Sequence, residues 1–353
     1  LHQIPEPGFR EYRTSAYLEA RLKAIGFQVT HLTETGLLAT LAGAEEGRHI
    51  GLRADMDALA FPDGAGGKTF IHACGHDAHC AMVLNAGERL AEEGVPRGTL
   101  HLIFQPAEET IRGAGAVIAG GKLPPLDALF GIHLRPKSEL AFGRATAQLL
   151  HQATFPTTVT FYGRTAHAAR PAEGVNALLA GAETIAELSR LTVETEQSWS
   201  LKPTDISCFD NAHNQIPERC RVTFDVRAQS SALGERLIRA LEDCARRNAG
   251  RIGASAVCRT DRGYAAEYDP ELVRICEEAI REVLGEVAPP VRTLGSEDFH
   301  AYHAEAGIPV AYMGLGADLV PGLHQPDMTF NLDCLPYGVA ILCGCVRRAL
   351  ALG

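Results

Sequence analysis

Ten consecutive residues, Ile71 to Cys80, read IHACGHDAHC and contain three histidines, two cysteines and one aspartate. Thiolate, imidazole and carboxylate groups together suit zinc, cobalt or manganese better than magnesium or calcium. Cys74 and His76 flank a glycine, which allows a tight turn that directs both side chains the same way. The stretch has four possible explanations: a structural zinc knot, a redox thiol, a catalytic metal site, or a crowded turn.

Further ligand-type residues follow apolar runs that predict buried strands. Asp55 and Asp57 follow HIGLRAD, Glu108 and Glu109 follow GTLHLIF, and His133 lies within DALFGIHL. Short apolar runs separated by helical patterns predict a mainly parallel sheet covered on both faces. Because ligands of such sheets bind at the carboxyl ends of the strands, we expect these side chains to converge on one edge.

Each of these signals alone has an ordinary structural explanation. The aspartates could form a turn, the glutamates could begin a helix, and His133 could be a core histidine. Their coincidence at independent strand ends nevertheless predicts a metal site. A closed structural site fits less well, because such sites usually show paired, closely spaced cysteines and this set is rich in carboxylates.

The predicted fold is α/β, with a mainly parallel-sheet α/β/α domain interrupted by a smaller α+β domain. From about Ala153 the apolar pattern changes to period two, which is typical of half-exposed antiparallel strands, and amphipathic helical patterns lie between them. This order predicts a β-α-β-β-α-β, ferredoxin-like insert. We expect residues 1–150 and 261–353 to form the main domain and residues 151–260 to form the insert.

Composition excludes several classes of function. The chain has 353 residues, 46% of them apolar and 22% charged, so it can bury a sizeable core. Its net charge is −10 with no basic stripe, so nucleic acid is not an expected partner. No membrane-spanning stretch and no leader is evident, which predicts a cytoplasmic protein without a membrane partner, although Leu1 rather than Met comes first. Ten scattered cysteines without a C-x-x-C motif predict mostly buried thiols.

The sequence resembles the family of zinc-dependent aminoacylases, carboxypeptidases and acetylornithine or succinyl-diaminopimelate deacylases. Within it, the chain is most similar to the hippurate hydrolase-like branch, which includes the auxin-conjugate amidohydrolases. The stretches that carry the resemblance span nearly the whole chain in the family's order: LHQIPEPGFREYRT, GLRADMDAL, HACGHDAH, FQPAEE, GIHLRP, GRTAHAARPAEGVNAL, GSEDF and GLHQPDMTF. The resemblance implies that the main domain is catalytic and that the insert is a dimerisation or lid domain, so we expect a homodimer or larger homo-oligomer.

The same resemblance implies a dinuclear centre with two divalent ions per subunit: zinc, manganese or cobalt. It assigns five residues as the ligands: Cys74, His76, Glu109, His133 and His324. Glu108 matches the general base and Asp57 the aspartate that supports the centre. Asp55 stands where other branches have a histidine ligand. His167 matches a histidine that reaches the active site of the partner subunit in many relatives.

The chemistry of amide hydrolysis accounts for these assignments. A bound metal lowers the pKa of water, and Glu109 is one of the ligands of that metal. A second carboxylate, Glu108, takes the proton of the water and passes it to the leaving amine. The developing oxyanion needs a further donor, which His167 can supply. The α-carboxylate of an amino acid calls for a guanidinium or other hydrogen-bond donors. The candidates for that role are Arg227, Arg170, Asn211 and Asn214.

The predicted function is metal-dependent hydrolysis of the amide bond of small N-acyl amino acids, which yields a carboxylic acid and a free amino acid. A dipeptidase or carboxypeptidase on the same centre is an alternative. A cysteine hydrolase is disfavoured because Cys74 and His76 lie two residues apart on one turn and point at a common ligand. The non-enzyme alternative is a metal- or ligand-binding sensor, against which Glu108 argues, since a sensor needs no general base.

Overall fold

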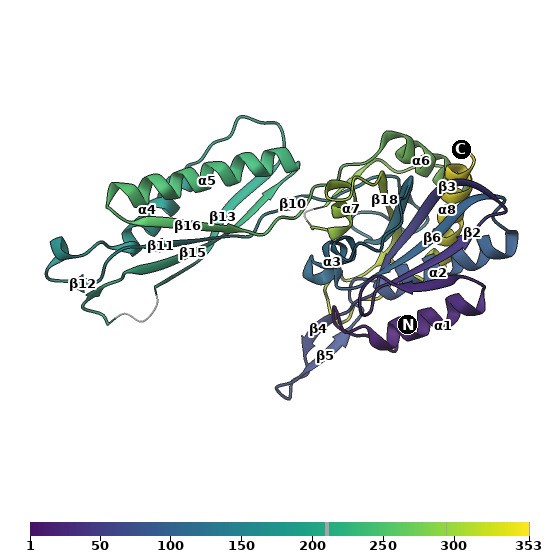
Figure 1. Ribbon diagram of the computed structural model, residues 1–353, viewed down its shortest axis with the longest axis horizontal. Helices are drawn as coiled ribbons and strands as arrows, with labels where there is room; N and C mark the ends of the chain where they lie inside the picture. Colours follow the sequence, from purple (N-terminus) through teal and green to yellow (C-terminus); the bar gives the residue numbers. More distant parts are fainter. Residues whose placement is uncertain (209–211, 294, 353) are drawn as a thin grey trace. The chain divides into compact units, whose positions relative to one another are not determined.

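The computed structural model describes residues 1–208, 212–293 and 295–352 and divides the chain into two compact units (Figure 1). Unit 1 comprises residues 1–150, 267–293 and 297–353. Unit 2 comprises residues 151–266 and 294–296. Unit 2 is therefore inserted into unit 1, and each unit has its own hydrophobic core.

Unit 1 is built on a seven-stranded sheet in the order β1-β2-β6-β3-β7-β18-β8. Its strands are β1 Gln28–His31, β2 Leu37–Ala42, β3 Glu45–Asp55, β6 Arg97–Gln105, β7 Ala128–Pro136, β18 Val310–Leu319 and β8 Ala145–Thr146. The four central strands run parallel. On one side of them β2 and then the edge strand β1 are antiparallel, and on the other side the edge strand β8 is antiparallel to β18. Every residue of β7 is buried, which explains its continuous apolar run. The predicted mainly parallel sheet is confirmed.

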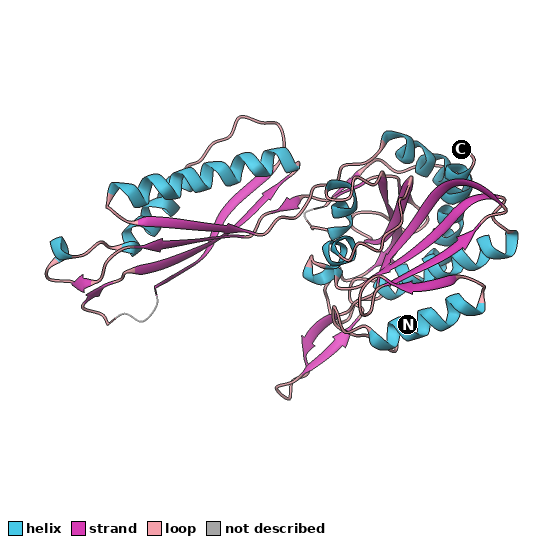
Figure 2. Ribbon diagram, in the orientation of Figure 1, coloured by secondary structure: helices cyan, strands magenta, loops and turns pink. Residues whose placement is uncertain are grey.

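Helices cover this sheet on both faces (Figure 2). Their bounds are α1 Tyr12–Ala24, α2 His76–Glu93, α3 Gly113–Ala119, α6 Pro270–Leu284, α7 Ala301–Ala304 and α8 Leu335–Leu350. Helices α2, α6 and α8 pack together over β3, β7 and β18. On the other face, α3 packs with α7 and with the short 3-10 helix η3, Asp298–His300, whose Phe299 lies over Gly131 of β7.

Unit 2 is an antiparallel sheet with two helices packed on it, the predicted α+β arrangement. Its elements are β10 Ala153–Thr154, β11 Thr157–Tyr162, α4 Ala177–Leu188, β13 Trp199–Cys208, β15 Arg219–Ala228, α5 Ser231–Arg251 and β16 Ser255–Thr260. Strand β15 is central, between β13 and β11, and alternates between buried and exposed positions. Its buried residues face α4 and α5, and the Ser230 side chain caps α5 by accepting from the Leu233 amide.

Shorter elements complete the two units. They are the hairpin β4 Leu59–Pro62 with β5 Lys68–Ile71, the parallel pair β9 Leu149–Leu150 with β17 Val291–Arg292, the ribbon β12 Ala166–His167 with β14 Gln215–Ile216, and the 3-10 helices η1 Glu108–Thr110, η2 Pro171–Glu173 and η4 Leu332–Cys334. Among the described residues, none of the helices has the length and apolar character needed to cross a bilayer.

A histidine pair in unit 1 makes its stability sensitive to acid. The His101 ring contacts Nδ1 of His49 at 3.0 Å and the Thr40 hydroxyl at 3.1 Å, and burial lowers the pKa of His101 to about 4. The unfolded chain therefore binds more protons than the folded chain between pH about 6.5 and about 4. We expect the free energy of unfolding to fall across this window as the pH decreases, by up to about 3 kcal/mol from this residue.

Urea unfolding of wild type and of His101→Gln at several pH values measures this contribution. The variant should lose part of the decline between pH about 6.5 and 4. Identical pH profiles for wild type and His101→Gln would contradict the assignment.

Candidate metal centre

The carboxyl ends of four neighbouring strands supply the side chains of one cluster, which is largely buried except for the exposed His324. Asp55 is the last residue of β3, and His133 lies near the end of β7. Glu108 and Glu109 begin η1 shortly after β6, and His324 follows β18. The convergence expected of a parallel sheet thus brings together residues more than 200 positions apart in the chain, and α2 starts at the same edge.

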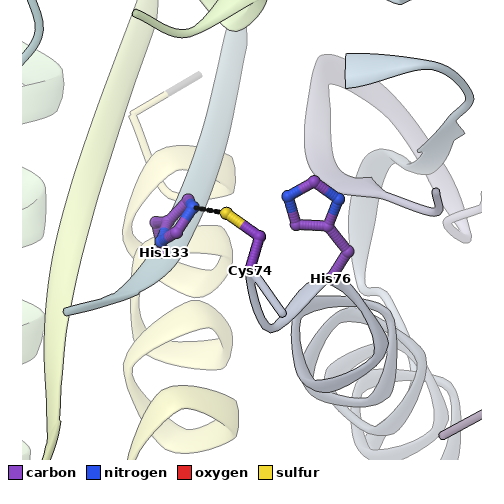
Figure 3. Close-up of side chains that lie close together, drawn as sticks. All are labelled: Cys74, His76 and His133. Carbon is purple, nitrogen blue, oxygen red and sulfur yellow. Dashed lines mark hydrogen bonds between the residues drawn. The ribbon is translucent and has the colours of Figure 1, made fainter. Parts of the chain in front are cut away.

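A first group of ligand-type atoms comes from Cys74, His76 and His133, which Figure 3 shows facing one another. The three atoms lie within 4.8 Å of one another, and Cys74 Sγ is 3.6 Å from His133 Nε2. The other His133 nitrogen, Nδ1, donates to the Leu134 carbonyl at 2.6 Å, which leaves Nε2 as an acceptor facing the cluster. Gly75, with φ of +86°, allows the turn that places Cys74 and His76.

Asp57 orients the His76 ring through its Nδ1 atom, and the other ring nitrogen, Nε2, has no hydrogen-bond partner in the part of the chain that the structure describes. Its Nδ1 lies 3.1 Å from the backbone oxygen of Asp57 and 3.2 Å from Oδ1 of the same residue. Its Nε2 is buried and has no hydrogen-bond partner among the described residues, although Glu108 and Glu109 oxygens lie 3.8 Å away. A buried ring nitrogen without a partner is costly, so it marks a position for a bound ligand such as a metal ion.

A second group consists of Cys74, Glu109 and His324, again within 4.8 Å of one another. His324 Nε2 lies 3.3 Å from Glu109 Oε2, while Glu109 Oε1 is buried without a hydrogen-bond partner in the described chain. His324 has a left-handed backbone, with φ of +62°, and its amide donates to the Ala73 carbonyl at 2.7 Å. Cys74 belongs to both groups.

The turn that carries Glu108 and Glu109 has an unusual backbone. Residues Ala107 and Ile111 on its two sides are both left-handed, with φ of +56° and +55°. Such conformations cost about 1–3 kcal/mol each for residues other than glycine, so the surrounding contacts must maintain them. Asp57 is one such contact, because its two oxygens accept from the amides of Glu108 and Glu109 at 3.1 and 3.0 Å.

A buried ionic network adjoins the cluster, and of its members only Asp55 was predicted from the sequence to take part in the site. Arg53 is 1% exposed and donates to Asp55, Glu297 and Asp298 at 2.7, 3.1 and 3.0 Å. Tyr312 donates to Glu297 at 2.8 Å. Two signals pointed to this network: an arginine within the apolar strand GLRAD, and the GSEDF stretch, which supported only the resemblance.

The electrostatic balance of the cluster favours bound cations. Six carboxyl groups lie in or next to the cluster: Asp55, Asp57, Glu108, Glu109, Glu297 and Asp298. Arg53 forms ion pairs with three of them, Asp55, Glu297 and Asp298. Burial and the nearby Glu297 raise the pKa of Glu108 well above its usual value. Burial likewise raises the pKa of Asp298 to about 7, with Arg53 opposing the shift. Buried acids without partners are costly, and thiol, imidazole and carboxylate donors fit transition metals, so the residues present suit such ions.

The other predicted residues lie in unit 2. His167 is exposed on β12 and accepts from the Ala169 amide at 3.1 Å, and the Asn214 carbonyl accepts from the neighbouring Ala168 amide at 2.8 Å. His167 and Asn214 are therefore brought together.

The predicted carboxylate-binding arginines have acidic neighbours of their own. Arg170 lies 3.7 Å from Glu173, and Arg227 donates to Asp225 at 2.9 Å. Asn211 lies outside the described residues.

Comparisons with known proteins cover almost the whole chain. Residues 51–348 match the model of peptidase family M20/M25/M40. An IAA-amino acid hydrolase ILR1-like 2 from Arabidopsis thaliana is 31% identical over 367 residues, which cover 97% of this chain and 81% of that protein. An N-acetyl-L-cysteine deacetylase from Bacillus subtilis is 30% identical over 344 residues, covering 94% and 82%.

A solved structure shares the fold. A dinuclear metal-binding peptidase of the M20 family from Bacillus subtilis has a TM-score of 0.83 at 23% identity, over 99% of this chain and 96% of that one.

Proposed function

Because the chain belongs to peptidase family M20/M25/M40, we propose that it hydrolyses the amide bond of N-acyl amino acids with the help of metal ions bound at the cluster. The observation that carries the proposal is the juxtaposition of the two ligand groups with Glu108, a carboxylate that lies within 4.8 Å of both His76 and Glu109. The relatives named as an IAA-amino acid hydrolase and an N-acetyl-L-cysteine deacetylase act on substrates of this class.

Two divalent ions are proposed, zinc, manganese or cobalt, because two ligand groups share Cys74. One group is Cys74, His76 and His133, and the other is Cys74, Glu109 and His324. Metal ions bound there would lower the pKa of a water molecule and polarise the amide carbonyl. The dinuclear peptidase of similar fold supports this stoichiometry.

The protein's own groups perform the proton transfers. Glu108 takes a proton from the attacking water and delivers it to the nitrogen of the leaving amine. Asp57 holds the amides of Glu108 and Glu109 and faces Nδ1 of His76, so it aligns the base with the ligands. His167 is proposed to donate a hydrogen bond to the developing oxyanion.

Unit 2 is proposed to dimerise and to contribute to substrate binding through His167, Arg170, Asn214 and Arg227, with Asn211 outside the described residues. The support is the family resemblance and the proximity of His167 to Asn214. If His167 acts in the partner's site, a monomer should be nearly inactive. A monomeric species with full activity on size-exclusion chromatography would contradict this proposal.

A cytoplasmic location is part of the same proposal. It is supported by the ten cysteines, all of which are free thiols in the described chain. Free thiols are typical of reducing compartments.

The activity is tested by amine release from N-acetyl, N-benzoyl and N-succinyl amino acids and from dipeptides, after chelation and after restoring zinc, manganese or cobalt. Turnover restored by metal on an N-acyl amino acid supports the proposal, and the responsive substrate identifies the acyl group. Turnover of dipeptides alone would favour the peptidase alternative. Stoichiometric metal binding without any turnover would favour a sensor.

A further inference from the structure

Three successive backbone amides at the start of the Glu108 turn are directed at two buried carboxylates. Ala107 donates to Glu11 Oε1 at 2.9 Å, whereas Glu108 and Glu109 donate to the two oxygens of Asp57 at 3.1 and 3.0 Å. Of these two carboxylates, only Asp57 was predicted from the family resemblance to have a role in the site. Glu11 lies 96 positions before Ala107 in the chain and, like Asp57, accepts a hydrogen bond from a backbone amide of this turn.

Glu11 is itself held firmly. Its side chain is fully buried, and the Thr35 hydroxyl donates to its Oε2 at 2.7 Å. The Phe9 amide donates to its Oε1 at 3.0 Å, so that one oxygen serves both Phe9 and Ala107. A carboxylate with three donors in a buried position has one orientation, and that orientation determines where the Ala107 amide lies.

The N-terminal segment also contacts the turn directly. A Cβ atom on Gly8 would lie 2.9 Å from Ala107 Cα and 3.3 Å from Asp57 Oδ2. This spacing is too short for a side chain, so glycine permits the close approach. The segment before α1 therefore packs on the residue that precedes Glu108, and Glu11 supplies the hydrogen bond across that contact.

We propose that Glu11 is a positioning residue for the reaction: it holds Ala107 in its left-handed conformation and thereby directs Glu108 and Glu109 into the cluster. The proposal rests on the proposed role of Glu108 as the base. Ala107 is fully buried, so without Glu11 its amide has no acceptor of this kind. The turn would then relax toward a right-handed backbone, and Glu108 would move away from its working position.

The test compares three variants of the metal-loaded protein. Glu11→Ala should lower kcat by about 100-fold with little change in KM, because a displacement of about 1 Å at the reacting groups costs that much. Glu11→Gln keeps an acceptor oxygen for Ala107 and should stay within about tenfold of wild type. Thr35→Val, which removes one anchor of Glu11 and leaves its carboxylate in place, should lie between these two.

Glu6→Ala is the matched control. Glu6 lies on the same segment but accepts from the amides of Arg13 and Thr14 at the start of α1, at 3.0 and 2.9 Å. This variant removes hydrogen bonds to the start of α1 but none to the Glu108 turn, so its kcat should match that of wild type. A loss in Glu6→Ala equal to that in Glu11→Ala would overturn the proposal, because it would show a general effect on folding.

Amide hydrogen exchange separates this proposal from the proposed function. Exchange in the peptide spanning residues 107–111 should accelerate in Glu11→Ala and not in Glu6→Ala, whether or not a substrate has been found. An inactive wild type with this exchange pattern would refute the proposed function while supporting the structural step on which the positioning role depends. Unchanged exchange, or kcat of Glu11→Ala within threefold of an active wild type, would refute the role of Glu11.

Discussion

Replacing Glu108 with glutamine is expected to lower kcat by about 10²–10⁴-fold, the usual contribution of a general base, while the bound metal remains. Glutamine has nearly the same shape as glutamate but cannot accept a proton from water at neutral pH. The Glu108 amide would still donate to Asp57, so the turn and the ligand Glu109 should keep their positions. Steady-state kinetics together with metal analysis of the purified variant measure both parts of the expectation.

An exposed glutamate on α2 provides the control for this substitution. Glu92→Gln makes the same chemical change away from the cluster and should leave kcat and metal content unchanged. Full activity of Glu108→Gln would show that another group takes the proton. A simultaneous loss of metal would instead show that Glu108 is needed for metal binding.

Cys74→Ser is expected to abolish activity by removing metal. Cys74 is the residue shared by both ligand groups, so its loss affects the binding of each ion. Loss of a single outer partner of a ligand typically costs about 10–100-fold in metal affinity, and loss of a shared ligand should exceed this. Burial raises the pKa of the Cys74 thiol, which favours a neutral thiol until a cation is bound.

Cys80→Ser is the matched control for Cys74→Ser. Cys80 is also buried, and its thiol donates to the Asp55 carbonyl at 2.9 Å, a bond that a serine hydroxyl can replace. Metal titration should therefore show wild-type stoichiometry for Cys80→Ser and weakened binding for Cys74→Ser. Equal metal affinity in wild type and Cys74→Ser would remove Cys74 from the ligand set.

The sequence was informative where local order determines geometry. Parallel strands place their carboxyl ends at one edge, so Asp55, Glu108 and His133 could be expected to converge before any coordinates were known. The glycine between Cys74 and His76 likewise predicted their common direction. The family and the hydrolase class inferred from the motifs are confirmed by the comparisons, whereas the role of each site residue stays a prediction.

Contacts that depend on distant parts of the chain could not be predicted in the same way. Arg53 meets Glu297 and Asp298 across more than 240 positions, and no local pattern specifies that pairing. Glu11 directly precedes α1, whose sequence is largely polar, and its neighbours in the sequence do not indicate that its carboxylate is fully buried. Both contacts arise from tertiary packing, which also determines which carboxylates remain ionised.

The way in which unit 2 joins the chain has a consequence for how such proteins diversify. Its two ends are adjacent, because Ala266 donates to the His151 carbonyl and Gly263 donates to the Thr154 carbonyl. A segment whose ends lie together can be inserted or exchanged without separating the strands of the parent sheet. The cluster of ligand-type residues lies entirely within unit 1, so it can stay constant through evolution while the inserted unit 2 changes. Divergence in substrate choice then requires no change in the proposed metal ligands.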